Sequence, residues 1–305
     1  MDMASPSPFT VLSQINATSN GKNRACNDSG KEEEVLIFAI FTILFCVLGM
    51  LANGLVIWLL GSSVKRNTFA IYIINLSVAD FGFLTFELII EIHWLFTRLY
   101  CNFPYELFQM ILRLMYSAGQ FLLTVISIDR CLSVLFPIWY RCHRPVHMFT
   151  TVCAVICAVS FILSSILFTI ITVLRFGNSW VIYQFIVNIV LCLPLMTISS
   201  VTLFIKICFV SKSQRRRKLL TAILLTLFFF LVLAFPLNAF YFIRYVFEHV
   251  HPNLVHYGYL CACINSSINP MIYYLVGRQK DKTQRSMKEV LQRVFKEEEN
   301  CTDQM

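Results

Sequence analysis

The chain has 305 residues, of which 57% are hydrophobic and only 14% charged, and 28 of them are Phe. Soluble domains average about 25% charged and about 45–50% apolar residues, so this composition excludes an ordinary soluble protein and indicates a membrane protein. The net charge of +8 does not indicate nucleic-acid binding, because the basic residues occupy short stretches between long apolar segments. Cytoplasmic loops of membrane proteins carry their basic residues in this way.

Residues 1–34 are polar and lack the apolar stretch of a cleavable signal peptide. We expect them to form a disordered extracellular tail, glycosylated at the sequons that begin at Asn16 and Asn27. Cys26 of this tail and Cys101 are the two cysteines on the expected outer side, where disulfides persist. The sequence does not determine the distance between them, so a disulfide between Cys26 and Cys101 and two free thiols both stay open.

Seven apolar segments follow, each of about 20 residues or more, which is enough for a helix to cross about 30 Å of hydrocarbon. Their polarity does not alternate, and lipid requires backbone hydrogen bonds to be satisfied within the segment, so helices are predicted. The expected spans are 35–61, 69–93, 104–136, 148–174, 180–205, 219–243 and 255–276. The predicted fold class is an all-α membrane protein, with a seven-transmembrane helix bundle over residues 35–276.

The distribution of basic residues predicts the orientation of this bundle. Lys and Arg are concentrated in the loops at 65–66, 141–144 and 206–218, whereas the opposite loops hold Arg98 and Arg175. Loops rich in Lys and Arg stay in the cytoplasm. We therefore expect a multi-pass protein of the plasma membrane with its N-terminus outside.

Asp80 lies near the middle of the second segment. A charge at the centre of a bilayer costs at least about 2.5 kcal/mol, so its presence indicates a function. Two interpretations remain: Asp80 holds a cation, for which sodium is the expected ion, or it belongs to a hydrogen-bonded network without an ion. The polar residues expected around Asp80 are Asn53, Asn265, Ser266 and Asn269.

Charged residues also occur toward the expected outer ends of the helices. Glu87 and Glu91 are four residues apart and share one helix face, and Arg113 lies two to three turns into the third helix. Either the acids form a subsite for a basic peptide or amine, or they pair internally with Arg113. An anionic ligand stays open as well, because of the arginines. The candidate ligand pocket comprises Glu87, Glu91, Arg113, Tyr116, Arg175 and Arg244.

An acid–arginine pair, Asp129-Arg130, ends the third segment, and a Pro-containing basic turn follows it. Beyond the seventh segment, apolar residues recur at spacings of three and four between 287 and 295, with basic residues around them. This pattern predicts a C-terminal amphipathic helix on the membrane surface within residues 277–305, in contact with lipid.

The motifs together resemble the rhodopsin-like (class A) G-protein-coupled receptors over almost the whole chain, and "FPIWYRCHRP" is similar to the Mas-related receptors among them. The motifs are "LANGLVIW" with Asn53, "NLSVAD" with Asp80, Asp129-Arg130-Cys131, Pro194, Pro236 and "NPMIY" with Asn269, Pro270 and Tyr273. The resemblance implies an extracellular peptide or small charged ligand, and a heterotrimeric G protein of the Gq or Gi class as partner. It implies no enzymatic activity and no cofactor beyond a sodium ion at Asp80.

The resemblance also implies a switch. Asp129 holds Arg130 at rest, and outward movement of the sixth helix frees Arg130 to contact the G protein while Tyr273 moves inward. Asn269 and Pro270 belong to the same switch. An alternative function, a transporter or channel with a midplane ion site at Asp80, is less favoured because the chain lacks inverted repeats.

The sequence departs from the class A pattern at several positions. Ala234 stands where most class A receptors carry a Trp in the sixth helix, and residues 214–218 lack the acid that often binds Arg130. We therefore expect a weakly locked resting state with appreciable basal signalling.

Overall fold

The computed structural model describes residues 29–62, 68–97, 105–136, 140, 148–172, 181–209, 224–225, 228–229, 232–233, 235–246 and 254–277. These residues form seven long helices and, in the described ranges, no strand. The helices are α2 (Ser29–Gly61), α3 (Thr68–Thr97), α4 (Tyr105–Leu135), α6 (Met148–Thr172), α7 (Val181–Phe209), α9 (Phe235–Val246) and α10 (Leu254–Gly277). The helical fold class expected from the sequence is confirmed.

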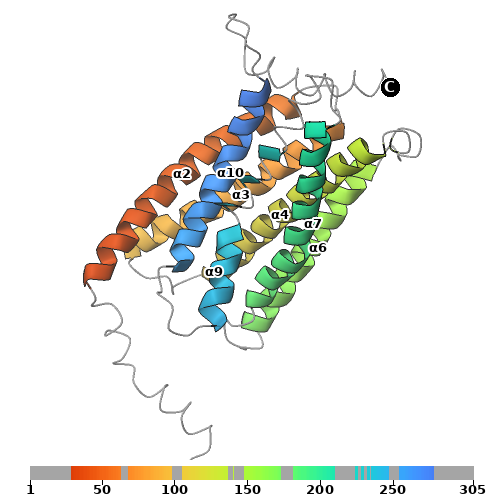
Figure 1. Ribbon diagram of the computed structural model, residues 1–305. Helices are drawn as coiled ribbons and strands as arrows, with labels where there is room; N and C mark the ends of the chain where they lie inside the picture. The colour runs from red at the N-terminus through yellow and green to blue at the C-terminus, as the bar shows by residue number, and fades with distance from the viewer. Residues whose placement is uncertain are drawn as a thin grey trace, which may run out of the picture.

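The helices lie side by side in one bundle (Figure 1). α4 packs against α3, α6 and α7, whereas α10 packs against α2, α3 and α9. Contacts between α2 and α3 and between α7 and α9 close the ring. The start of α2 and the end of α10 lie at opposite ends of the bundle (Figure 1), as an odd number of crossings requires. We refer below to the Arg130 end, where α4 finishes, and to the opposite end as the Glu91 end.

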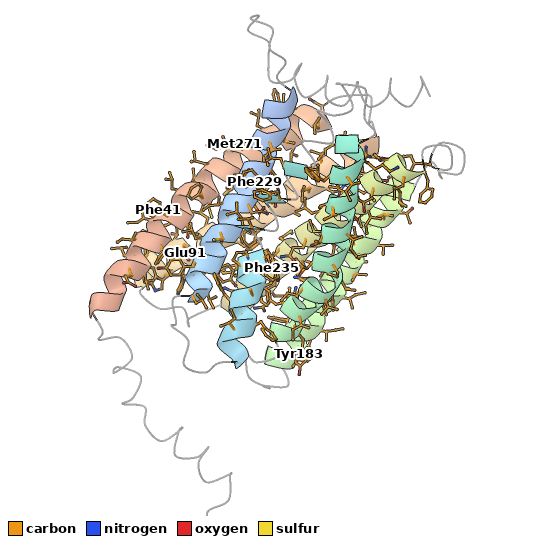
Figure 2. The ribbon with its side chains drawn as sticks, in the orientation of Figure 1. Phe41, Glu91, Tyr183, Phe229, Phe235 and Met271 are labelled. Atoms are coloured by element: carbon orange, nitrogen blue, oxygen red, sulfur yellow. The ribbon has the colours of Figure 1, made fainter. Side chains whose placement is uncertain are left out.

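The outer surface of the bundle is apolar. Along α2, large apolar side chains recur every three or four residues with exposed fractions between 37% and 68%, and Phe41 points away from the bundle in Figure 2. The inward side of the same helix instead buries Thr42 and Asn53. Since water would disfavour this arrangement and lipid favours it, the surface is a lipid-facing one. The described parts of α2, α3, α4, α6 and α7 each contain a stretch long and apolar enough to cross a bilayer.

Two boundaries differ from the sequence-based expectation. α2 begins at Ser29, so residues 29–34, which were predicted to belong to the disordered tail, are helical. The sixth helix was expected over residues 219–243, and the structure describes α9 from Phe235 to Val246. Most of the expected span before Phe235 lies outside the described residues.

Two apolar clusters form the interior. One, nearer the Arg130 end, includes Leu76, Leu122 and Leu203; the other, nearer the Glu91 end, includes Leu84 and Phe185 among its members. Along α3, Asp80 falls between Leu76 of the first cluster and Leu84 of the second. Asp80 therefore lies between two apolar clusters, one toward each end of the bundle.

Glycine allows α10 to approach α9 closely. A Cβ atom added at Gly258 would lie 2.9 Å from the Cα atom of Leu237, which is main chain and cannot move aside as a side chain can. At Gly49 of α2, an added Cβ atom would meet side chains instead: that of Ser267 on α10, and Cδ1 of Leu84 on α3 at 2.7 Å. These contacts set how closely the helices carrying the polar residues can pack.

Candidate functional site

The Arg130 end holds a buried, hydrogen-bonded charge pair. Arg130 donates to Oδ2 of Asp129 from Nη2 at 2.6 Å and from Nε at 3.2 Å. The hydroxyl of Tyr140 donates to the other oxygen, Oδ1, at 2.8 Å. The side chains of Arg130 and Asp129 are 6% and 3% exposed. Both carboxylate oxygens therefore have partners, and the carboxylate is held in one orientation.

Tyr140 lies one turn beyond the end of α4 and is positioned by its main chain. Its N–H donates to the carbonyl of Phe136 at 2.9 Å, and the N–H of Phe136 donates to Leu132 at 2.9 Å. These two hydrogen bonds place Tyr140 where its hydroxyl reaches back to Asp129. Sequence reasoning did not include Tyr140, because a side chain in a turn has no periodicity that shows which way it points.

A second polar group surrounds Asp80 in the middle of the bundle. Asn269 of α10 donates from Nδ2 to Oδ2 of Asp80 at 2.9 Å, and the side chain of Ser266 lies close to the same carboxylate. Asn53 of α2 donates from Nδ2 to the carbonyl of Ser266 at 3.0 Å and to that of Gly49 at 2.9 Å. The network therefore joins α2, α3 and α10.

Several buried oxygens in this region have no hydrogen-bond donor among the residues that the structure describes. They are the Oδ1 atoms of Asn53, Asn265 and Asn269. Gly119 of α4 faces the same region: the nearest atom to an added Cβ would be Oδ1 of Asp80 at 3.9 Å. Carboxylate and amide oxygens are ligands that hard cations prefer. The donor set therefore fits the sodium ion expected at Asp80, and Asp80, Ser266 and Asn269 are the residues that would hold it.

The Glu91 end buries two acids of α3. Glu87 and Glu91 are 2% and 5% exposed, and they lie close enough to interact electrostatically with each other and with Cys263 of α10. Figure 2 shows Glu91 in the region between α2 and α10. Oε2 of Glu87 has no hydrogen-bond partner. Cys46 of α2 and Cys263 are neighbours of these acids, with their sulfur atoms 3.7 Å apart.

The internal Glu–Arg pair that the sequence left open is not found in the described part of the chain. Arg113 is 5% exposed, yet its Nε and Nη2 atoms have no hydrogen-bond partner. Its main-chain carbonyl accepts a hydrogen bond from Gln184 of α7 at 3.2 Å, which places Arg113 near the α4–α7 contact. The acids interact instead with cysteines of α2 and α10.

A cluster of polar side chains surrounds this contact. Nε2 of Gln184 also donates to the hydroxyls of Ser117 on α4 at 2.7 Å and Ser164 on α6 at 3.4 Å. Asn188 donates from Nδ2 to Ser117 at 3.3 Å. Oε1 of Gln184 and Oδ1 of Asn188 remain without donors. We call Arg113, Ser117, Ser164, Gln184 and Asn188 the α4–α7 polar cluster. Gln184 and Asn188 lie four residues apart in an apolar segment, and this spacing of polar residues could have predicted the cluster from the sequence.

Tyr116 connects this region to α9. Asn238 of α9 donates from Nδ2 to the Tyr116 hydroxyl at 3.0 Å. Tyr241, one turn further along α9, stacks on Phe185 of α7 with ring centroids 4.1 Å apart and forms a 2.8 Å hydroxyl–hydroxyl hydrogen bond with Tyr259 of α10. The sixth helix of the bundle is therefore tied by directional contacts to three neighbours, α4, α7 and α10.

Several predicted residues lie outside the described residues or have side chains that do. The candidate disulfide (Cys26 and Cys101), the glycosylation sites (Asn16 and Asn27), Arg175 and the C-terminal amphipathic helix all lie outside them. Tyr273 and Arg244 are described as parts of α10 and α9 by their main chain. These predictions stay predictions.

Comparison with known proteins identifies the class of protein that this bundle and its charge pair define. Residues 52–273 match the family described as 7 transmembrane receptor (rhodopsin family). The chain is 33% identical over 310 residues to the human (Homo sapiens) Proto-oncogene Mas, covering 98% of this chain and 94% of the relative. It is 33% identical to the human Mas-related G-protein coupled receptor member X2, covering 97% and 93%. It is 34% identical to member D of Macaca fascicularis, covering 86% of each chain.

The chain therefore belongs to the rhodopsin family of seven-transmembrane, G-protein-coupled receptors. Within that family it is of the Mas-related type. It is accordingly a multi-pass membrane protein, and the class is one of receptors and not of enzymes.

Proposed function

We propose that the Arg130 end faces the cytoplasm and that this receptor activates heterotrimeric G proteins of the Gq or Gi class when an extracellular ligand binds at the Glu91 end. The observation that carries this proposal is the Asp129–Arg130–Tyr140 group at the finish of α4. A guanidinium held by a carboxylate at one end of a bundle can be released by helix movement without breaking the apolar core.

The proposed movement is an outward displacement of the sixth helix, of which α9 is the described part. α9 contacts α7 and α10 near the Glu91 end through Tyr241, and it contacts α4 through Asn238. A ligand that rearranges these contacts changes the balance between a closed state and an open state. For a complete shift from 1:99 to 99:1, the ligand must bind the open state more tightly by about 5.5 kcal/mol.

The orientation rests on two arguments. In the sequence, the basic stretches at 65–66 and 141–144 follow the ends of α2 and α4, and the stretch at 206–218 runs on from the end of α7; short loops rich in Lys and Arg remain in the cytoplasm. With seven crossings, the N-terminus and its sequons at Asn16 and Asn27 then lie outside, where glycosylation occurs. The plasma membrane is the membrane in which such a receptor meets an extracellular peptide or small charged ligand.

We further propose that Asp80, with Ser266 and Asn269, holds a sodium ion that modulates the receptor. The oxygens of Asn53, Asn265 and Asn269 that lack donors support an ion over a network satisfied by itself. Bound sodium would supply positive charge beside the carboxylate, and the side chains would keep α3 and α10 together. A transporter with its ion site at Asp80 is disfavoured, since the relatives are named as G-protein-coupled receptors.

Nucleotide exchange tests the proposal directly. Purified receptor in lipid nanodiscs is mixed with Gq or Gi heterotrimer, and GTP analogue binding is measured against empty nanodiscs. We expect receptor-dependent exchange that Arg130→Ala abolishes while leaving the thermal unfolding transition in place. Exchange that is undiminished in Arg130→Ala would show that the guanidinium is not the coupling group.

A further inference from the structure

Two buried thiols meet across the contact between α2 and α10. Sγ of Cys46 on α2 lies 3.7 Å from Sγ of Cys263 on α10, although the two residues are 217 positions apart in the chain. Both side chains are 0% exposed. A buried cysteine often serves only as a small apolar side chain. Two cysteines that meet sulfur to sulfur from different helices can in addition react with each other.

Other contacts between α2 and α10 hold the two helices at this distance. Nearer the start of both helices, the rings of Phe38 and Tyr257 meet edge to face, with centroids 4.2 Å apart. Beside the thiols, the hydroxyl of Ser267 donates to the carbonyl of Phe45 at 2.9 Å. Gly49 presents no side chain to Ser267, so the helices stay close on this side as well. The thiols are therefore positioned by contacts on both sides of them.

The sulfur atoms need only a short movement to bond. The sulfurs of a disulfide lie about 2.05 Å apart, so those of Cys46 and Cys263 would have to approach by roughly 1.7 Å. One torsion, about the Cα–Cβ bond, places each sulfur, and its rotation moves the sulfur while the main chain stays in place. Along α2 and α10, the pair lies on the Glu91 side of Asn53 and Asn269. That is the side proposed above to face outward, where disulfides persist.

We propose that Cys46 and Cys263 form a redox-active pair, which hydrogen peroxide converts to a disulfide between α2 and α10. In the first step, one sulfur bonds to a peroxide oxygen, the O–O bond breaks, and a sulfenic acid and one water form. In the second step, the other sulfur bonds to the sulfenic sulfur, the S–O bond breaks, and the disulfide and a second water form. The two thiol protons leave in the two waters, and the two electrons that the sulfurs lose reduce the peroxide.

The burial of the pair selects the oxidant. Thiol–disulfide exchange requires the incoming disulfide to reach the thiol, and neither sulfur has exposed surface. A large, charged disulfide such as oxidised glutathione is therefore excluded, whereas hydrogen peroxide is small and neutral.

The link would act on the switch, and this step rests on the proposed function. α10 carries Asn269 and Pro270, and a covalent bond to α2 limits how far α10 can move against it. The two thiols meet in the arrangement in which Arg130 is bound to Asp129, so the link favours that closed state. Agonist-independent nucleotide exchange should fall about threefold or more when the wild type is oxidised.

Peptide mass spectrometry tests the link itself. Receptor in nanodiscs is purified in dithiothreitol, transferred to buffer without it, and treated with millimolar hydrogen peroxide or with oxidised glutathione. The remaining thiols are alkylated after denaturation. With peroxide, we expect a linked peptide that contains Cys46 and Cys263, which dithiothreitol separates after denaturation, and two fewer alkylated thiols than in the reduced receptor. Oxidised glutathione should give no link.

Three variants assign the effect to the pair. Cys46→Ala and Cys263→Ala should each keep the partner thiol free to be alkylated. Cys261→Ala is the matched control, because Cys261 lies two residues from Cys263 on α10 and is only partly buried, and it should link as the wild type does. Peroxide should raise the unfolding temperature of the wild type by about 5 °C or more, as a disulfide between distant residues does, and should not raise that of Cys46→Ala.

The proposal is overturned if peroxide yields no linked peptide in the wild type, or if the same two thiols are lost by oxidation to acids without a link. This measurement on the wild type stands even if a variant fails to fold. A link formed equally well by oxidised glutathione would overturn the choice of oxidant, and an exchange rate unchanged by the link would overturn its effect on the switch. The mass spectrometry contains no G protein, so failure of the coupling proposal would remove exchange from every sample but leave the link intact.

Discussion

Replacing Asp129 with Asn should raise the agonist-independent activity of this receptor roughly tenfold or more. The substitution keeps the shape of the side chain but removes its charge, and both hydrogen bonds from Arg130 end on one oxygen, Oδ2, at 2.6 and 3.2 Å. The pair is almost fully buried, with side chains 6% and 3% exposed, so water does not replace these bonds in the closed state.

The magnitude follows from the strength of these bonds. A hydrogen bond to a charged group contributes about 1.5–3 kcal/mol net, which corresponds to a change of about 12-fold to about 150-fold in the closed–open equilibrium. Minor states of proteins are populated at about 0.1–10%, so a receptor that is open about 1% of the time would become open about 10–60% of the time. The amide of Asn still accepts a hydrogen bond, which favours the lower part of this range.

The assay is GTP analogue binding to Gq and Gi heterotrimers, without ligand, in membranes matched for receptor number. Asp129→Glu is the control, because it keeps the carboxylate, and it should stay near the wild-type rate. If Asp129→Asn and wild type give the same exchange rate at equal receptor number, the charge pair does not hold the closed state, and the reasoning from its geometry is refuted.

Three further predictions concern other contacts. Tyr140→Phe leaves Oδ1 of Asp129 buried without its donor, so the free energy of unfolding should fall by about 1–3 kcal/mol, measured by thermal unfolding in nanodiscs. Asp80→Asn should abolish the rise in unfolding temperature that wild type shows when sodium replaces potassium, because a ligand that binds only the folded state stabilises it. Gly258→Ala should destabilise the receptor by about 1–3 kcal/mol, since the new methyl group would lie 2.9 Å from the Cα atom of Leu237.

Each of these has an outcome that contradicts it, and the glycine substitution also has a control. For the glycine, the control is Gly54→Ala, where the nearest atom to the new Cβ is 3.5 Å away and the helix should gain about 0.5–1 kcal/mol. Equal effects at the two glycines would mean that α9 and α10 are not in close contact. Unchanged stability in Tyr140→Phe would remove the tyrosine from the charge pair. A sodium effect that persists in Asp80→Asn would place the ion elsewhere.

The acids of α3 show where reasoning from sequence succeeds and where it stops. The spacing of Glu87 and Glu91 put both on one face, and the structure buries both. The pair with Arg113, one of the two interpretations that the sequence left open, is not found among the described residues, and the main-chain carbonyl of Arg113 accepts from Gln184. Spacing along one helix is a local property of that helix, whereas the partner on a neighbouring helix depends on how far each is rotated about its axis.

The sequence alone determined that this chain crosses a membrane as seven helices, because segment length and polarity are tested directly against the thickness of the hydrocarbon and its lack of hydrogen-bonding groups. It also identified the charge pair at the end of α4 and the polar residues around Asp80, since charges in apolar segments are rare and costly. Only the tertiary structure decided that Tyr140 completes the charge pair and that the main-chain carbonyl of Arg113 accepts a hydrogen bond from Gln184. Helices that are apolar nearly all round carry no strong periodicity to orient them, so their rotation, and with it the choice of polar partners, is settled by packing among the helices.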